Sequence, residues 1–321
     1  MAGGIGAGGN GLTWTGAIWS LAAGKALNTP TEGGEDVANG TMEAGNPPTS
    51  WTPVNSVVLA GEADERTSGA GSQSMSLTNG DDLYGRATQT LDNLDGTWIF
   101  IRGWAKKITS YIYIDVKTSG GTNIASSGTT STSWVELLKT TRLIGNGCYI
   151  SVALDNVSGN EARADDVSVK PLTLSTLFRS LVVSTQNVIA TTEIVWTNNK
   201  TQAGLVLNLD DAATPANFVI AYLDGLGNCK LDKCVAGTYT NVISAAVTYV
   251  SGAQIRVIKD GTSYRLFYNN LAVGAVSTIS DAGIVDNTLH GLFSTYSGNT
   301  FDNFTVYARG NSGEYSALEA M

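Results

Sequence analysis

The sequence predicts an all-β protein with two antiparallel β-sandwich, or jelly-roll, domains behind a Gly-rich N-terminal arm. Three observations predict this class. Charged residues make up only 15% of the 321 residues, below the usual quarter. The chain holds 37 glycines, 28 serines and 37 threonines, which suits strands and tight turns. Short apolar runs recur about every ten residues, separated by turn sequences and without a helical period.

The Gly-rich arm spans residues 1–37 and shows no core-forming period. A segment of this composition does not bury enough apolar surface to fold alone. It carries two tryptophans, Trp14 and Trp19, which we expect to be exposed. We therefore predict a docking arm that orders on a neighbouring subunit and uses both rings as anchors.

The first predicted sandwich covers residues 38–173. Turn sequences such as TNGDD, NLDG, SGG and GNG separate its apolar runs, and Gly, Asn and Asp are the residues that tight turns favour. The predicted strands are 54–60, 72–78, 87–93, 97–105, 110–118, 133–141, 148–154 and 164–171.

The second predicted sandwich covers residues 174–310, after a short connector at 171–180. Its clearest part is QIRVIKDGTSYRLFYNNLAVG at 254–274, which predicts three strands joined by a DG and an NN turn. The halves share no sequence period, which indicates two different sandwiches rather than a duplication. Residues 311–321 are predicted to form a polar tail.

The order of motifs in the first domain carries a family resemblance. The motifs are NGTMEAG, Trp51, TWIFIRGWAKK, TSWVELLKTT and the closing ARADDVSVKP, at 39–45, 51, 97–107, 132–141 and 162–171. In this order they resemble the jelly-roll carbohydrate-binding modules of the CBM4/9/22 type. The resemblance implies a jelly roll and does not identify a ligand.

The same resemblance implies a structural calcium ion held by Glu43 with Asp165 or Asp166. Hard carboxylate oxygens from the first and last strands would hold the two ends of the domain together. The alternative is that Glu43 caps a turn and one aspartate faces water.

Strand alternation separates the two faces of the central strands. If isoleucines form the core, the opposite faces carry aromatic rings beside charged groups, as a sugar platform requires. The predicted carbohydrate-binding residues are Trp98, Arg102, Trp104, Tyr111 and Tyr113. The alternative places these rings in the core or in a subunit interface.

The second domain resembles concanavalin-like, laminin-G-type sandwiches through RLFYNN and the closing FDNFTVY. Domains of this type are generally binders. Asp210 with Asp211 forms a candidate oxygen cluster for calcium, against the alternative of a solvated turn. Sequence shows no paired carboxylates, since Glu193 stands alone, and predicts the single histidine, His290, to be partly buried and hydrogen-bonded. We expect no enzyme activity.

The composition excludes several classes of partner. A net charge of −9 disfavours nucleic acid, which needs clustered cations. No run reaches roughly 18 apolar residues, so we expect no membrane insertion. The N-terminus lacks the pattern of a secretory signal, which favours assembly in a cytoplasm. Cys148 stands alone, and Cys229 and Cys234 are expected to be reduced in a predicted hairpin, with pairing as the alternative.

Two binding-type sandwiches behind an arm are typical of virion proteins of tailed bacteriophages, and ANGTMEAGNPPTSW and FDNFTVYARGNSGEYS resemble phage tail or structural proteins. We predict a non-catalytic virion structural or adhesion protein, for capsid decoration or in the tail or fibre. Its expected partners are other virion proteins, copies of itself and host-surface glycans. The alternative is a secreted or cell-surface carbohydrate-binding protein of a polysaccharide-degrading bacterium; the third is a laminarinase-like glycosidase.

Overall fold

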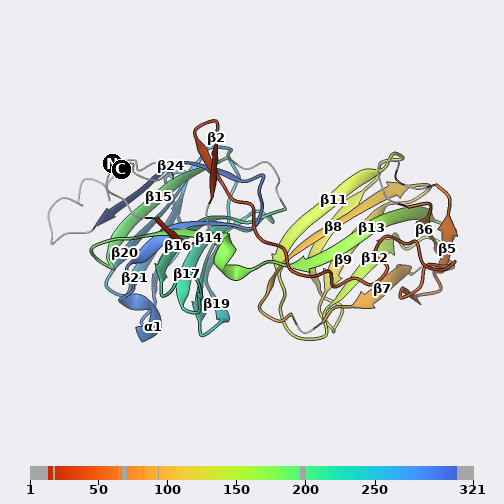
Figure 1. Ribbon diagram of the computed structural model, residues 1–321, viewed down its shortest axis with the longest axis horizontal. Helices are drawn as coiled ribbons and strands as arrows, with labels where there is room; N and C mark the ends of the chain where they lie inside the picture. The colour runs from red at the N-terminus through yellow and green to blue at the C-terminus, as the bar shows by residue number, and fades with distance from the viewer. Residues whose placement is uncertain are drawn as a thin grey trace. The chain divides into compact units, whose positions relative to one another are not determined.

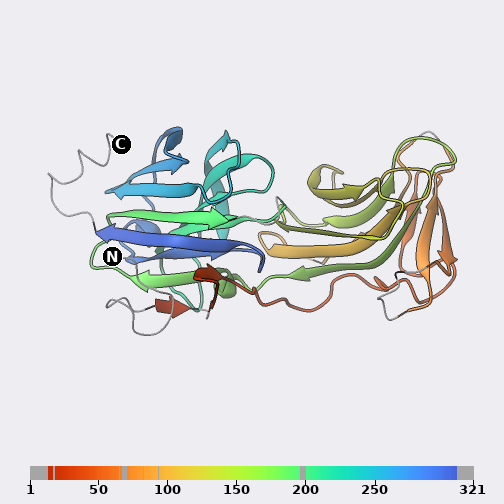
Figure 2. The same ribbon diagram turned by 90° about the horizontal axis from the view of Figure 1, so that it is seen from above.

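The protein is all-β, as the sequence predicts, with antiparallel sheets throughout (Figures 1 and 2). The computed structural model describes residues 14–16, 19–64, 66, 71–81, 83–92, 94–195 and 200–308. The chain divides into two compact units. We call Glu32–Leu172 the first sandwich, and Met1–Thr31 together with Thr173–Met321 the second sandwich.

The first sandwich consists of two five-stranded sheets. The β9 sheet has the order β10-β9-β12-β7-β4, and the β8 sheet has the order β11-β8-β13-β6-β5. The strands are β4 (Thr52–Val54), β5 (Val58–Glu62), β6 (Ser74–Thr78), β7 (Arg86–Thr90), β8 (Trp98–Lys107), β9 (Ile112–Lys117), β10 (Asn123–Thr129), β11 (Val135–Arg142), β12 (Tyr149–Leu154) and β13 (Glu161–Pro171).

The core of the first sandwich is made by alternate residues of its strands. Ile99 and Ile101 of β8 face Ile112, Ile114 and other apolar side chains from the β9 sheet. These isoleucines are at most 3% exposed, and burying each one contributes about 1.5–3 kcal/mol. The predicted division of these strands into an isoleucine face and a second face is confirmed. The other face of each strand points away from the core.

The second sandwich consists of two seven-stranded sheets, with orders β1-β14-β23-β16-β17-β18-β19 and β2-β3-β24-β15-β20-β21-β22. A single turn of 3₁₀-helix, η1 (Leu174–Leu177), precedes β14, and a short helix, α1 (Ala282–Val285), precedes β23. The strands are β1 (Trp14–Gly16), β2 (Ser20–Ala22), β3 (Lys25–Leu27), β14 (Phe178–Val182), β15 (Val188–Val195), β16 (Ala203–Leu209), β17 (Phe218–Leu223), β18 (Asn228–Val235), β19 (Thr238–Ala246), β20 (Gln254–Asp260), β21 (Ser263–Tyr268), β22 (Leu271–Thr278), β23 (Leu289–Ser294) and β24 (Thr300–Ala308).

The described part of the predicted docking arm up to Thr31 belongs to the second sandwich, and its last residues, from Glu32 to Val37, belong to the first. β1 pairs with β14, and β3 pairs with β24. Trp19 is 4% exposed and packs in the core with Phe301, the ring centroids lying 5.3 Å apart. The prediction that Trp19 is an exposed anchor is therefore wrong. The segment adds strands to existing sheets, so backbone pairing holds a sequence that lacks a core of its own.

The other parts of the predicted ends lie partly outside the description. Trp14 is in β1 opposite Leu181, and its side chain is outside the described residues. The predicted polar tail at 311–321 is outside them as well. Within the described ranges, no helix has the length and apolar character needed to cross a membrane.

The cysteines of the second sandwich lie in one continuous strand, not in a hairpin. Cys229 and Cys234 are both in β18, and both are free and buried. They are five positions apart, so their side chains point to opposite faces of the strand. Only Cys229 belongs to the core cluster. The predicted hairpin is wrong, and the predicted reduced state is what the structure has.

Candidate functional site

A cleft of about 340 Å³ opens on the outer face of the β9 sheet. Its position follows from strand alternation, because Ile112, Ile114 and Val116 of β9 face the core and the residues between them face outward. The lining residues come from four strands and one loop: Tyr84, Arg86, Tyr113, Asp115, Lys117, Asn123, Ser126 and Ala153.

Strand register arranges this face in rows across the sheet. One row runs from Tyr113 through Ala153 to Arg86. The next row runs from Ser126 through Asp115 to Ser151. Large or charged side chains thus alternate with Ala and Ser, whose short side chains leave the space that the cleft occupies.

Two tyrosines supply the aromatic surface of the cleft. Tyr84 is 54% exposed. Tyr113 stacks on Tyr111, with ring centroids 4.3 Å apart, and its hydroxyl donates to Asp155 Oδ1 at 3.1 Å. Burial, together with that hydrogen bond and the charge of Asp155, raises the pKa of Tyr113 to about 12. The ring is therefore held in one orientation and stays protonated at neutral pH.

The polar groups of the cleft are incompletely satisfied. Lys117 Nζ lies 3.5 Å from Asp115 Oδ2 and also donates to Asn123 Oδ1. In contrast, Asp115 Oδ1 and Arg86 Nε are buried and have no hydrogen-bond partner among the described residues. The same holds for Ser151 Oγ, which lies opposite Asp115 on β12 but does not line the cleft. Leaving a buried polar group without a partner costs about 1–3 kcal/mol, so such groups are rare in folded proteins and call for an explanation.

The predicted platform is not one surface. Trp98, Arg102 and Trp104 lie on β8, whereas Tyr113 lies on β9 and Tyr111 immediately precedes that strand. β8 and β9 belong to opposite sheets, so their outer faces point away from each other. The prediction of a shared site is wrong, because alternation identifies a strand's faces but not its sheet.

The three β8 residues are occupied by contacts within the fold. Arg102 pairs with Glu136 at 3.2 Å and lies 4.8 Å from the centroid of the Phe100 ring. The Arg66 guanidinium lies 4.5 Å from the centroid of the Trp104 ring. Trp98 is 3% exposed. Of the five predicted residues, only Tyr113 lines the cleft, with Tyr111 behind it.

Sequence reasoning missed Arg86, Lys117 and Ser126 as site residues. A signal was present for Lys117, because it shares the outward phase of Tyr113 and Asp115 in YIYIDVK. Arg86 and Ser126 enter the site only through strand pairing across the sheet. Their sequence neighbourhoods, GRATQT and NIASSGT, carry no comparable signal.

The residues predicted to bind calcium do not fit such a site. Both carboxylate oxygens of Glu43 accept hydrogen bonds from the Ser72 amide at 2.9 and 3.0 Å. Asp166 pairs with the Arg66 guanidinium. Burial, and secondarily the charge of Asp166, raises the pKa of Asp165 to about 6. In the described part of the chain, no three His, Cys, Asp or Glu side chains gather as metal ligands.

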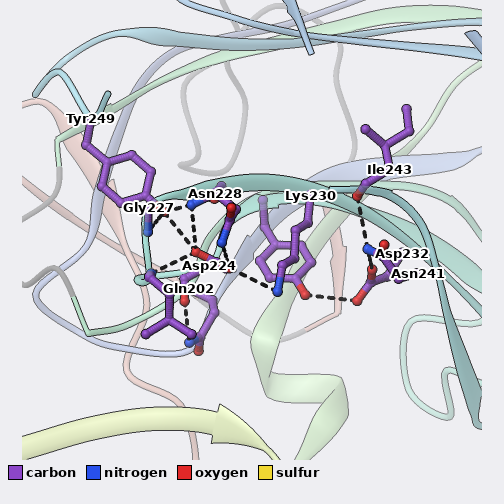
Figure 3. A network of polar contacts seen from close by, with 11 residues as sticks. Gln202, Asp224, Gly227, Asn228, Lys230, Asp232, Asn241, Ile243 and Tyr249 are labelled. Carbon is purple, nitrogen blue, oxygen red and sulfur yellow. Dashed lines mark hydrogen bonds and ion pairs between the residues drawn. The ribbon is translucent and has the colours of Figure 1, made fainter. Parts of the chain in front are cut away.

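A second polar network lies in the second sandwich, across β17, β18 and β19 (Figure 3). Asp224 accepts from the Tyr249 hydroxyl at 3.0 Å, from Asn228 Nδ2 at 2.9 Å and from Lys230 Nζ at 2.9 Å. Burial opposes ionisation, but these hydrogen bonds outweigh it and lower the pKa of Asp224.

Asp232 completes this network. It accepts from the Tyr222 hydroxyl at 2.8 Å and from Asn241 Nδ2 at 2.7 Å. A catalytic acid needs a raised pKa and a free proton, whereas Asp224 is stabilised as an anion by several donors. The network braces neighbouring strands and the loop between them.

The remaining candidates of the second sandwich are structural. His290 is fully buried, more than predicted, and its Nδ1 accepts from the Asn208 amide at 3.3 Å. Burial lowers the pKa of His290 to about 3. Asp210 accepts from the backbone amides of Ala216 and Asn217 at 3.1 and 2.9 Å, so it stabilises a loop.

Comparisons with known proteins give fold-level similarities. No protein-family model matches the sequence, and a search of curated proteins found no match. The carbohydrate-binding module CBM66 from Bacillus subtilis is 14% identical, with 41% of this chain and 82% of that chain covered and a TM-score of 0.34. The CBM22-1 xylan-binding domain from Paenibacillus barcinonensis is 14% identical, covering 46% and 99%, with a TM-score of 0.36.

A phage protein is among the similar structures. The enzymatically active domain of tailspike protein 4 from bacteriophage CBA120 is 19% identical, with 43% of this chain and 21% of that chain covered and a TM-score of 0.35. Scores this low carry no argument about the ligand.

Proposed function

We propose that this chain is a non-catalytic glycan-binding protein whose ligand occupies the cleft on the β9 sheet. The observation that carries the proposal is the pair of buried polar atoms in the lining, Asp115 Oδ1 and Arg86 Nε, which have no partner among the described residues and share the lining with the ring of Tyr113. A ligand that supplies both hydrogen-bond donors and acceptors would complete them.

A sugar has the two kinds of surface that this cleft has. Its hydroxyl groups donate and accept hydrogen bonds, and the CH groups of one ring face stack on aromatic rings. Tyr84 and Tyr113 provide the aromatic contact, and Arg86, Asp115 and Asn123 provide the polar contacts. Ala153 and Ser126 keep the floor low, so a pyranose ring can approach the backbone of the sheet.

Calorimetric titration against soluble polysaccharides tests the proposal. Tyr113→Ala removes the fixed ring, and we expect affinity to fall about tenfold, since an aromatic contact is worth roughly 1 kcal/mol or more. The matched control is Trp104→Ala, which removes a ring on the opposite sheet and should leave affinity unchanged. Equal losses in both variants, or no binding to any polysaccharide by the intact chain, would refute the cleft as the site.

We place this protein in the virion of a tailed bacteriophage, where it would act as a structural or adhesion component on host-surface glycans. The sequence resemblance of ANGTMEAGNPPTSW and FDNFTVYARGNSGEYS to phage structural proteins supports this setting. Display of many copies on one particle would raise the avidity of a weak cleft by mass action. Trp19 is buried, so it would not anchor the protein to a neighbouring subunit of the particle.

Labelling with antibodies raised against the chain tests the virion setting. Particles produced from the genome that encodes the chain should be labelled and should contain it by mass spectrometry. Its absence from such particles, together with its presence on the surface of a polysaccharide-degrading bacterium, would favour the alternative setting and leave the cleft proposal intact.

A further inference from the structure

The charged residues of the cleft differ in whether they have partners. Lys117 is engaged by Asp115 and Asn123. Arg86 lines the same cleft, half-buried, and its side chain has no ion pair or hydrogen bond with a described residue. Arginine has five donors in a planar fork, so a guanidinium without a partner among the described residues is a strong unfulfilled donor.

The charge of the lining contrasts with that of the chain. The cleft residues include two bases, Arg86 and Lys117, and one acid, Asp115, which gives a local charge of +1. The whole chain carries −9. Because Lys117 and Asp115 lie 3.5 Å apart and offset each other, Arg86 is the lining cation left without a lining carboxylate of its own. The Asp155 carboxylate, outside the lining, accepts a hydrogen bond from the Tyr113 hydroxyl.

We infer that the cleft selects glycans built from uronic acids, with the sugar carboxylate bound by Arg86. This inference rests on the proposed function. A carboxylate is planar and matches the guanidinium fork in a bidentate pair. The neutral hydroxyls of the same sugar would meet Asp115 Oδ1, the other polar atom of the lining that has no partner among the described residues.

The register of the sheet places the carboxylate and the ring contact within reach of one sugar. Tyr113 and Arg86 lie in one row with only Ala153 between them. Their strands are two strand spacings apart, about 10 Å. A uronate ring stacked on Tyr113 would extend over Ala153 and direct its carboxylate toward Arg86.

Titrations with oligosaccharides of equal length test the inference. The probes are oligogalacturonate, oligoalginate, a sulfated oligosaccharide and a neutral xylo-oligosaccharide. We expect at least one uronate to bind tenfold or more tightly than the neutral probe, and its affinity to fall as salt rises. We expect Arg86→Gln to remove that advantage and leave the weaker neutral binding, and Arg86→Lys to retain part of it.

The matched control is Arg102→Gln, which removes an arginine that is paired on the opposite face of the sandwich and should change no affinity. Neutral probes that bind as tightly as both uronates, or an Arg86→Gln variant with unchanged preference, would overturn the inference. Tighter binding of the sulfated probe than of the uronates would also overturn the inference, because the preferred anion would then be a sulfate and not a carboxylate. The proposed function itself would fail in a different way: no probe would bind the intact chain, or Tyr113→Ala would bind a probe as tightly as the parent does.

Discussion

The two outer faces of the first sandwich carry similar residues, which differ in the contacts that their side chains make. The β8 face holds Trp104 under Arg66, and Arg102 paired with Glu136. The β9 face holds Tyr113 and the unpaired Arg86 around a cleft. Both faces combine rings with cations. Arg102 on the β8 face has a carboxylate partner, whereas the side chain of Arg86 on the β9 face has no partner among the described residues and lines a cleft. Composition alone therefore does not distinguish the two faces; a cleft and the contacts of each side chain do.

A substitution that fills the cleft on the β9 face should have the largest effect of all on glycan affinity. In Ala153→Phe, a ring would occupy the floor between Tyr113 and Arg86. We expect glycan affinity to fall by a hundredfold or more, with at most a 1–3 kcal/mol loss of stability from crowding. Calorimetric titration and urea unfolding measure the two quantities. A variant that binds as the parent does would move the ligand out of this cleft.

Substitutions on the β8 face should change the stability of the fold. Asp165 is 4% exposed, and burial raises its pKa to about 6 from an ordinary 3.8. Above pH 6 the folded state must hold a charge that the unfolded state holds more easily. The native state therefore loses stability as pH rises from 3.8 through 6.

Asp165→Asn should remove that penalty and stabilise the protein by up to about 3 kcal/mol at pH 8, since one pKa unit equals 1.36 kcal/mol. At pH 3.5 the substitution should change little. Unfolding at both pH values measures the difference. Destabilisation at pH 8 that appears only when calcium is present would instead restore the calcium prediction for Glu43, Asp165 and Asp166.

Ser151→Ala sharpens the comparison at a single atom. Its hydroxyl is buried without a partner among the described residues, so removing it should stabilise the fold by about 1 kcal/mol. Glycan affinity should stay unchanged, because Ser151 is fully buried and does not line the cleft. Ser127→Ala on the same sheet serves as a control, because Ser127 is buried and is engaged in an interaction within the fold, and this substitution should be destabilising. If the change in the free energy of unfolding has opposite signs in the two variants, the Ser151 hydroxyl is an unsatisfied buried group, as we expect. Changes of the same sign would contradict this.

The smallest effect should come from the ion pairs of the β8 face. Asp64 pairs with both Lys106 and Arg163, and it is exposed enough for solvent to screen the charges. Asp64→Asn should therefore cost about 1 kcal/mol or less in stability and nothing in affinity. Because its pKa is lowered in the fold by these cations, against the opposing effect of burial, the parent should lose this contribution as pH falls. Thermal unfolding from pH 7 to pH 3 measures it.

Local pattern was enough to predict the sandwich class, the isoleucine faces and the outward phase of Tyr113 and Asp115, because these depend on alternation within a strand. Alternation could not show that β8 and β9 lie in opposite sheets, because that depends on pairing between distant segments. Nor could it show that Trp19 is buried, since its burial comes from Phe301 at the far end of the chain. Arg86 became a site residue only through its row in the sheet.

The two ends of the first sandwich leave it side by side. Gly33 donates to the Pro171 carbonyl at 2.7 Å, and Thr173 donates to the Thr31 carbonyl at 2.9 Å. The first sandwich is thus an insertion in the sequence of the second, which is built from segments on both sides of it in the chain. In such an arrangement one inserted domain can be replaced by another between the same two points of the chain without changing the second sandwich. A cut in either connecting segment would leave the two sandwiches joined by the other segment.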